Sequence, residues 1–143
     1  RQTILDYLPD IKKEDWEVDI DIPEKECKIY GDKFSVERII GNIIKNNLEH
    51  GQVGAYIGIK LESNQDGYNI FITDKGPGIK KEEIPLIFER KYEGKDAGKY
   101  SSLNSGFGLA IADKLIQLHN GFIDVSSKPN SKTVFKMFFP AVN

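Results

Sequence analysis

Residues 72–79 read ITDKGPGI and bring one carboxylate, two glycines and a proline into a short stretch. Apolar residues alternate from Tyr68 up to this stretch, so the sequence predicts a half-buried strand that ends near Asp74. Open α/β sheets bind ligands at strand ends. Gly76 and Gly78 allow the main chain to approach a flat ligand, and Asp74 can accept a hydrogen bond from an exocyclic amine. An ordinary surface turn is the alternative interpretation, because these residues are also good turn formers.

The composition indicates one domain with a hydrophobic core. The chain has 143 residues, of which 39% are hydrophobic, and this is too short for two full domains. A net charge of -2 and scattered lysines give no electrostatic basis for binding nucleic acid. The single cysteine, Cys27, excludes an internal disulfide and fits a reducing compartment.

The remaining elements follow from hydrophobic periodicity. Apolar residues recur at helical spacing over 33–50, where Asp32 can cap the start, and over 109–119, which Asn120 and Gly121 should end. Residues 1–9 resemble the end of a preceding helix that stops at Pro9. A short helix is expected over 82–88. Strands are predicted over 16–22, 28–30, 55–61, 67–73, 121–127 and 133–139, with a hairpin turn at 64–67.

Two asparagines on the first long helix suggest a metal ligand. Asn42 and Asn46 lie four residues apart, hence one turn apart on the same flank of the helix. A carboxamide oxygen suits Mg²⁺, which keeps waters and phosphate oxygens in its other positions. Two asparagines on a wet surface are the alternative. The magnesium interpretation therefore requires a phosphate site nearby.

The start of the second long helix offers such a phosphate site. Residues 105–109 read SGFGL, and their backbone N–H groups lie at a helix N-terminus, where the helix dipole favours anions. An ordinary loop before a helix has the same composition. The preceding residues 89–104 lack periodicity, and a connection of this length is uncommon unless it acts as a lid.

Taken in order, these motifs resemble the catalytic and ATP-binding domain of sensor histidine kinases, which has the Bergerat fold of the gyrase, Hsp90, kinase and MutL superfamily. The resemblance covers about residues 16–140. It implies an α/β (α+β) two-layer sandwich, in which a mixed, mostly antiparallel sheet packs against about three helices, with a mobile ATP lid. Residues 11–143 would form the catalytic domain, and residues 1–10 the tail of a preceding dimerisation helix or a linker.

The resemblance also implies roles for individual residues. Residues 38–46 look like the asparagine box of the family, which makes Asn46 the Mg²⁺ ligand and Asn42 its catalytic support. Asp74 would bind the adenine amine. The other positions implied to contact ATP are His50, Gly76, Gly78, Ile79, Phe88, Tyr92, Ser105, Gly106, Phe107, Gly108, Leu109 and Thr133.

The sequence departs from the family pattern at four positions. Asn47 replaces a usual alanine, and Glu49 stands where a lysine or arginine is common. Asn104 and Lys132 occupy positions where glycine is common. These departures bear on the phosphate side of the site more than on adenine.

The residue four positions before the magnesium asparagine separates the branches of the superfamily. ATP-hydrolysing members have a glutamate there as general base, whereas the Asn42 carboxamide has no useful basicity. On family grounds neither His50 nor His119 is the phosphoacceptor. The resemblance therefore implies a kinase module that passes the γ-phosphate to a histidine on an upstream dimerisation domain.

That reading implies several partners and a location. The parent would be a homodimeric, membrane-anchored sensor with this domain in the cytoplasm, acting on a response regulator. A nucleotide-binding module without phosphoryl transfer is the alternative, and an ATPase is a third hypothesis that Asn42 disfavours.

Overall fold

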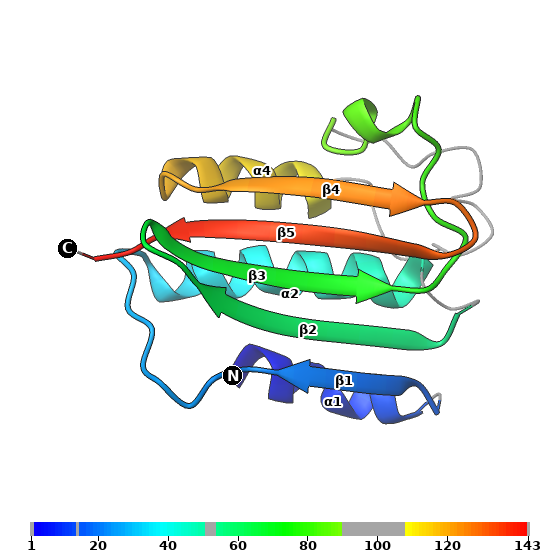
Figure 1. Cartoon of the computed structure of the whole chain (residues 1–143), viewed down its shortest axis with the longest axis horizontal. Helices are drawn as coiled ribbons and strands as arrows, with labels where there is room; N and C mark the ends of the chain where they lie inside the picture. The colour runs from blue at the N-terminus through cyan, green and yellow to red at the C-terminus, as the bar shows by residue number, and fades with distance from the viewer. Residues whose placement is uncertain (1, 14, 51–53, 90–107, 143) are drawn as a thin grey trace.

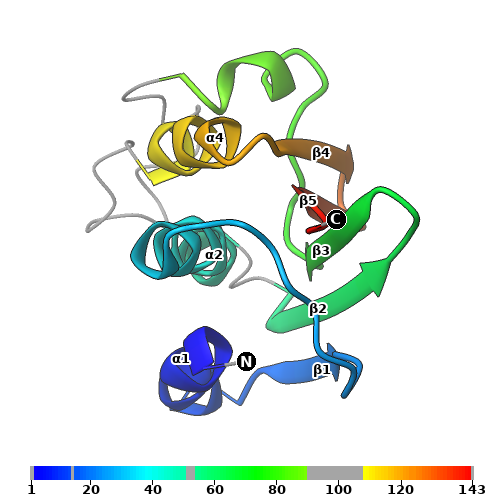
Figure 2. The ribbon, with the colours of Figure 1, turned by 90° about the vertical axis from the view of Figure 1, so that its left-hand side faces the viewer.

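A mixed sheet with helices on one face makes up the fold (Figure 1). The structure is a computed structural model that describes residues 2–13, 15–50, 54–89 and 108–142. Figure 2 shows the two layers edge-on, with α1, α2 and α4 on one side and the strands on the other. The expected two-layer architecture with a mostly antiparallel sheet is confirmed.

The helices and strands follow the predicted periodicities closely. The α-helices are α1 (Gln2–Lys13), α2 (Lys33–His50) and α4 (Gly108–Leu118), and a 3-10 helix, η1, spans Ile84–Leu86. The strands are β1 (Glu17–Asp21), β2 (Tyr56–Ser63), β3 (Gly67–Asp74), β4 (Phe122–Lys128) and β5 (Lys132–Pro140). The bounds predicted for α2 are confirmed, and the five main strands lie within a few residues of their predicted positions.

The strand order is β1-β2-β3-β5-β4. β1 pairs in parallel with β2, and the other three pairs are antiparallel (Figure 1). A parallel pair needs a crossover, and α2 lies in the connection between β1 and β2. β5 enters the sheet between β3 and β4, so the end of β3 lies beside the start of β5.

Alternate side chains of the strands face the helices and form the core. Ile72 pairs with Ile59 on one side and with Phe135 on the other, and all three side chains are buried. The helices contribute the opposite half of this core, because their apolar stripes face the sheet. The fully buried apolar helix residues are Ile11, Ile39, Ile43, Ile44, Ala112 and Ile116.

Polar caps fix the ends of the two long helices. The Asp32 carboxylate accepts hydrogen bonds from the backbone N–H of Ser35 (3.0 Å) and from its hydroxyl (2.9 Å). These bonds hold the pKa of Asp32 below its usual value. At the end of α4, Asn120 takes a positive φ of 61° and the Gly121 N–H donates to the Ile116 carbonyl, which confirms the predicted stop.

His119 joins these two helix ends. Its Nδ1–H donates to the Leu115 carbonyl (2.8 Å), and its Nε2 accepts a hydrogen bond from the Asp32 N–H (3.2 Å). The neutral imidazole supplies one donor and one acceptor, so both ring nitrogens are used. His119 therefore has a structural role between the end of α4 and the start of α2.

The predicted hairpin between β2 and β3 is confirmed. The Asn64 side-chain oxygen accepts hydrogen bonds from the N–H groups of Asp66 (2.8 Å) and Gly67 (2.9 Å). The Asn64 N–H donates to the Gly67 carbonyl (2.9 Å) and closes the turn. The turn sets the register in which Ile59 lies opposite Ile72.

The prediction that a helix stops at Pro9 is wrong, because α1 continues to Lys13. Proline removes one intrahelical hydrogen bond, but Ile4 and Ile11 on either side of it are buried in the core. Packing of this apolar stripe outweighs the local cost of the proline. The helix thus crosses the expected boundary between residues 10 and 11, and the assignment of residues 1–10 to a dimerisation helix or linker stays a prediction.

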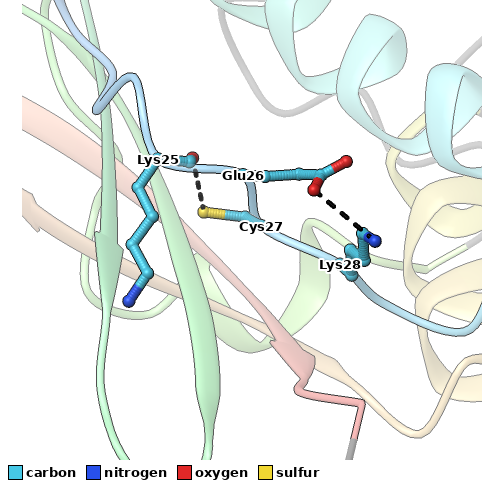
Figure 3. A network of polar contacts seen from close by, with 4 residues as sticks. All are labelled: Lys25, Glu26, Cys27 and Lys28. Atoms are coloured by element: carbon cyan, nitrogen blue, oxygen red, sulfur yellow. Dashed lines mark hydrogen bonds and ion pairs between the residues drawn. The ribbon is translucent and has the colours of Figure 1, made fainter.

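The predicted strand over 28–30 is also wrong. These residues lie in the connection between β1 and α2 and pair with no strand of the described sheet. Ile29 packs partly against the core, but Tyr30 is 77% exposed. Figure 3 shows two local contacts in this loop: the Cys27 thiol donates to the Lys25 carbonyl (3.5 Å), and Lys28 pairs with Glu26 (3.5 Å). Both members of the ion pair are exposed, so it adds little stability.

The short helix expected over 82–88 is reduced to η1, a single 3-10 turn. Pro85 has no N–H to donate, and the bonds from Leu86 to Glu83 and from Glu89 to Leu86 span three residues instead of four.

In the part of the chain that the structure describes, no helix is long and apolar enough to cross a membrane.

We predict that α1 is an integral part of this fold. Replacing the fully buried Ile11 with alanine should lower the free energy of unfolding by about 2–4 kcal/mol, because a cavity opens under the helix. Leu5 on the same helix is 53% exposed, and Leu5→Ala should change that free energy by less than about 0.5 kcal/mol. Urea titrations monitored by circular dichroism measure both. Equal, small effects would show that α1 does not pack on the domain in solution.

Candidate functional site

Asp74 ends β3 with a side chain that is only 5% exposed. Its Oδ1 accepts a hydrogen bond from the Gly76 N–H (2.9 Å), and its Oδ2 accepts one from the Asn47 Nδ2 of helix α2 (3.4 Å). Burial raises the pKa of Asp74 to about 6, and the Gly76 bond opposes part of this rise. The predicted amine-reading carboxylate is therefore buried, as such a residue requires.

The turn after Asp74 depends on Gly78. Its φ of +81° is a conformation that side-chain-bearing residues rarely adopt, and a Cβ there would lie 3.0 Å from the Pro129 Cα. The Pro77 carbonyl accepts a hydrogen bond from the Asn130 N–H (3.0 Å), which ties the turn to the β4–β5 loop. The glycine at position 78 is thus required by backbone geometry.

Two hydroxyl side chains, Ser127 of β4 and Thr133 of β5, lie next to the Asp74 region. Thr133 lies opposite Asp74 in the sheet and is 2% exposed. Its Oγ1 is 2.8 Å from the Ser127 Oγ, which accepts a hydrogen bond from the Ile79 N–H (2.8 Å). The predicted positions Asp74, Ile79 and Thr133 are therefore brought together, and Ser127 is the residue that the sequence analysis missed. Its only signal in the sequence is a hydroxyl at the end of the strand predicted over 121–127.

Helix α2 lies against both Asp74 and the start of α4. The half-buried Asn42 donates from its Nδ2 to the Gly108 carbonyl (3.0 Å), in the first turn of α4. Asn46, also half-buried, lies one turn further on and directly precedes Asn47, which contacts Asp74. His50 ends the helix, and burial lowers the pKa of its imidazole. One helix therefore carries both predicted asparagines: Asn42 contacts α4, and Asn46 is the chain neighbour of the residue that contacts Asp74.

The remaining predicted positions are only partly described. Phe88 packs edge-on against Phe135 of β5, with ring centroids 6.5 Å apart, and this contact anchors the chain before the expected lid. Leu109 is partly buried against the core. Tyr92, Ser105, Gly106 and Phe107, together with residues 90–104 of the expected lid, lie outside the described residues.

The donor set fits Mg²⁺ only if phosphate supplies most of the oxygens. Among residues 2–13, 15–50, 54–89 and 108–142, no group of three or more His, Cys, Asp and Glu side chains could hold a metal ion. A single carboxamide oxygen from Asn46 is compatible with Mg²⁺, which commonly keeps waters and takes phosphate oxygens as ligands.

A separate hollow lies on the face of the sheet opposite the helices. Its volume is about 560 Å³, and it is lined by side chains of β1, β2, β3 and β5 that include Asp19, Tyr56 and Phe71. Phe71 alternates with Ile72, so this hollow and the helix-covered core are on opposite faces of β3. It is not part of the site around Asp74.

Comparison with protein families and curated proteins gives consistent results. Residues 31–143 match the family described as histidine kinase-, DNA gyrase B-, and HSP90-like ATPase. The chain is 29% identical over 135 residues to the sensor histidine kinase YcbM of Bacillus subtilis (strain 168), covering 94% of this chain and 43% of that protein. It is 31% identical over 139 residues to the sensor histidine kinase YvrG of the same organism, covering 97% of this chain and 24% of that protein. The chain thus spans less than half the length of these relatives.

Solved structures show the same fold. The mycobacterial sensor histidine kinase MprB superposes with a TM-score of 0.82 at 26% identity, over 98% of this chain and 94% of that chain. The catalytic domain of the histidine kinase ThkA superposes with a TM-score of 0.83 at 21% identity, over 100% of this chain and 92% of that chain.

We predict that the buried Asp74 carboxylate makes the unliganded domain less stable as the pH rises. Its folded pKa of about 6 exceeds its ordinary value of 3.8, so the folded state binds more protons between these values. The contribution of Asp74 to the free energy of unfolding should therefore fall from pH 4 to pH 6, by on the order of 2 kcal/mol. Asp74→Asn should gain stability relative to the parent chain across this window, as measured by urea titration at several pH values.

Asp124→Asn, which changes an exposed carboxylate of β4, is the matched control. Its stability relative to the parent should stay nearly constant with pH. The same flat difference for Asp74→Asn would mean that the Asp74 carboxylate is not buried in solution.

Proposed function

Because this chain belongs to the histidine kinase-, DNA gyrase B-, and HSP90-like ATPase family, we propose that it is the catalytic domain of a sensor histidine kinase, which binds ATP with Mg²⁺. The observation that carries this proposal is the buried Asp74 at the end of β3, held beside the asparagine helix α2. The names of its relatives, which are sensor histidine kinases, support the kinase branch of the family.

In this proposal Asp74 selects the base. A buried carboxylate accepts a hydrogen bond from the 6-amino group of adenine, whereas guanine presents a carbonyl oxygen at that position. Gly76 and Gly78 let the backbone lie close to the base, and Asn46 holds the metal. Mg²⁺, when bound, neutralises charge on the phosphates.

The phosphoryl acceptor is a histidine outside this chain. Both ring nitrogens of His119 are used in hydrogen bonds, and His50 ends α2 in a half-buried position. In the proposed reaction an imidazole nitrogen of the dimerisation domain forms a bond to the γ-phosphorus, while the bond to the β–γ bridging oxygen breaks and ADP leaves. The imidazole N–H proton is lost to solvent.

Asn42 favours this reaction over ATP hydrolysis. Its Nδ2 donates to the Gly108 carbonyl, so the side chain supports the start of α4, and a carboxamide cannot take a proton from water. The alternative of a nucleotide-binding module without phosphoryl transfer rests on Glu49, an acidic residue near the phosphate side. We further propose a homodimeric, membrane-anchored parent with this domain in the cytoplasm, and a response regulator as the downstream partner.

Asp74→Asn should weaken binding of adenine nucleotides, ATP and ADP alike, by about 100-fold, because it replaces a charged acceptor with an amide. Isothermal titration calorimetry of the purified chain with Mg²⁺ and ADP measures the change. Asp124→Asn is again the control and should bind like the parent. Unchanged affinity in folded Asp74→Asn would remove Asp74 from the nucleotide site.

Phosphoryl transfer is tested with radiolabelled ATP. The chain alone should acquire no acid-labile label, and it should label the histidine of a separately made dimerisation domain from its own parent. Transfer should be slow, because an untethered encounter lacks the effective concentration that a linker provides. Asn46→Ala should abolish transfer, whereas Lys45→Ala, an exposed neighbour on α2, should not. Label on His50 or His119 would overturn the acceptor assignment, and ATP binding without transfer in the intact parent would favour the non-catalytic alternative.

A further inference from the structure

Asn47 is a polar residue in the apolar stripe of α2, and its side chain is fully buried. Its Nδ2 donates to the Asp74 Oδ2 at 3.4 Å, which links α2 to the end of β3. Its Oδ1 is buried and has no hydrogen-bond partner within the described part of the chain. A buried acceptor without a partner is destabilising, and Asn47 differs from the other such residues in its direct hydrogen bond to Asp74.

The orientation of the Asn47 amide follows from its neighbour. An ionised carboxylate only accepts hydrogen bonds, so the NH₂ group of Asn47 has to face Asp74. The side-chain carbonyl oxygen of Asn47 therefore points away from Asp74 Oδ2 and is the atom without a hydrogen-bond partner among the described residues. Asp74 of β3 and Asn47 of α2 together carry acceptor oxygens at the end of β3, and each Asp74 oxygen accepts one hydrogen bond within the described part of the chain.

An exocyclic amine matches such a pair of acceptors. A 6-amino group carries two N–H bonds, and a site with one acceptor satisfies only one of them. A 6-oxo group would instead place a third oxygen beside the two acceptors, which is repulsive. The chemistry of the pair therefore selects an amino-purine.

Resting on the proposed function, we propose that Asn47 is a second specificity-determining residue for the base, whose Oδ1 accepts a hydrogen bond from the 6-amino group of adenine while its Nδ2 orients Asp74. Nucleotide binding would give the Asn47 Oδ1 a hydrogen-bond donor. The preference for adenine over other bases, measured as a ratio of affinities, would then exceed the preference that Asp74 alone provides.

The binding affinities of three nucleotides distinguish a role of Asn47 in base recognition from a purely structural role. ADP carries the 6-amino group, IDP carries a 6-oxo group, and purine riboside diphosphate has no substituent at that position. With Mg²⁺ and calorimetric titration, Asn47→Ala should weaken ADP binding by about 3- to 10-fold, the worth of one hydrogen bond. Binding of purine riboside diphosphate should change by less than about 2-fold, because it offers no amine to either residue.

Asn69 provides the matched control. It is a buried asparagine of β3 whose Oδ1 also has no partner among the described residues, but alternation along the strand puts it on the face opposite to Asp74. Asn69→Ala should leave the affinities for all three nucleotides unchanged. Asn47→Leu keeps the volume without polar atoms, and it should show the same nucleotide pattern if the alanine variant fails to fold.

The outcomes are distinguishable. A loss confined to ADP supports the role of Asn47 in base recognition. An equal loss for all three nucleotides, or no loss, overturns it and leaves the nucleotide site around Asp74 standing. Absence of ADP binding by the parent chain would overturn the proposed function and this inference with it.

Discussion

The buried carboxylate of Asp74 is the constraint around which the site is built. It lies at the end of a central strand, where burial raises its pKa to about 6. Among the described residues only a backbone N–H and one amide donate hydrogen bonds to it. Ionising a carboxyl group in such surroundings costs free energy. The fold tolerates that cost because β3 lies between β2 and β5, where the ladder and the apolar core support it on both sides.

Helix α2 connects the region around Asp74 to the other elements of the site. Asp32 and His119 connect its start to the end of α4, Asn42 connects its middle to the start of α4, and Asn47 connects it to Asp74. Between these polar contacts the helix packs through fully buried isoleucines. Asn46 shares this rigid helix, so its position relative to Asp74 depends on packing that spans the whole domain. A site built on packed elements holds its geometry better than one built on loops alone.

Two departures from simple expectation occur where polar atoms are buried. Asn47 occupies an apolar position of α2 and leaves one oxygen without a partner in the described chain, and Ser127 links Ile79 to Thr133 behind the turn. Asn47 would be a poor choice for stability alone, since a buried acceptor without a partner is costly. The half-buried Ser127 hydroxyl has two hydrogen-bond partners. Proteins often violate local rules at functional sites, and Asn47 is hydrogen-bonded directly to Asp74.

The sequence by itself determined the elements that depend on near neighbours. The bounds of α2, its Asp32 cap, the Asn64 turn and the alternation of five strands all follow from spacing of two to four residues, and the Asp74 motif indicated the candidate site. Tertiary structure decided what depends on partners distant in the chain. Burial of Ile4 and Ile11 allows α1 to continue past Pro9. Tyr30 is exposed, and residues 28–30 form no strand. The Asn47 side-chain oxygen has no partner among the described residues because Asp74 faces the amide nitrogen instead. The physical reason is that local propensities amount to fractions of a kcal/mol per residue, whereas burial and unsatisfied polar groups amount to several.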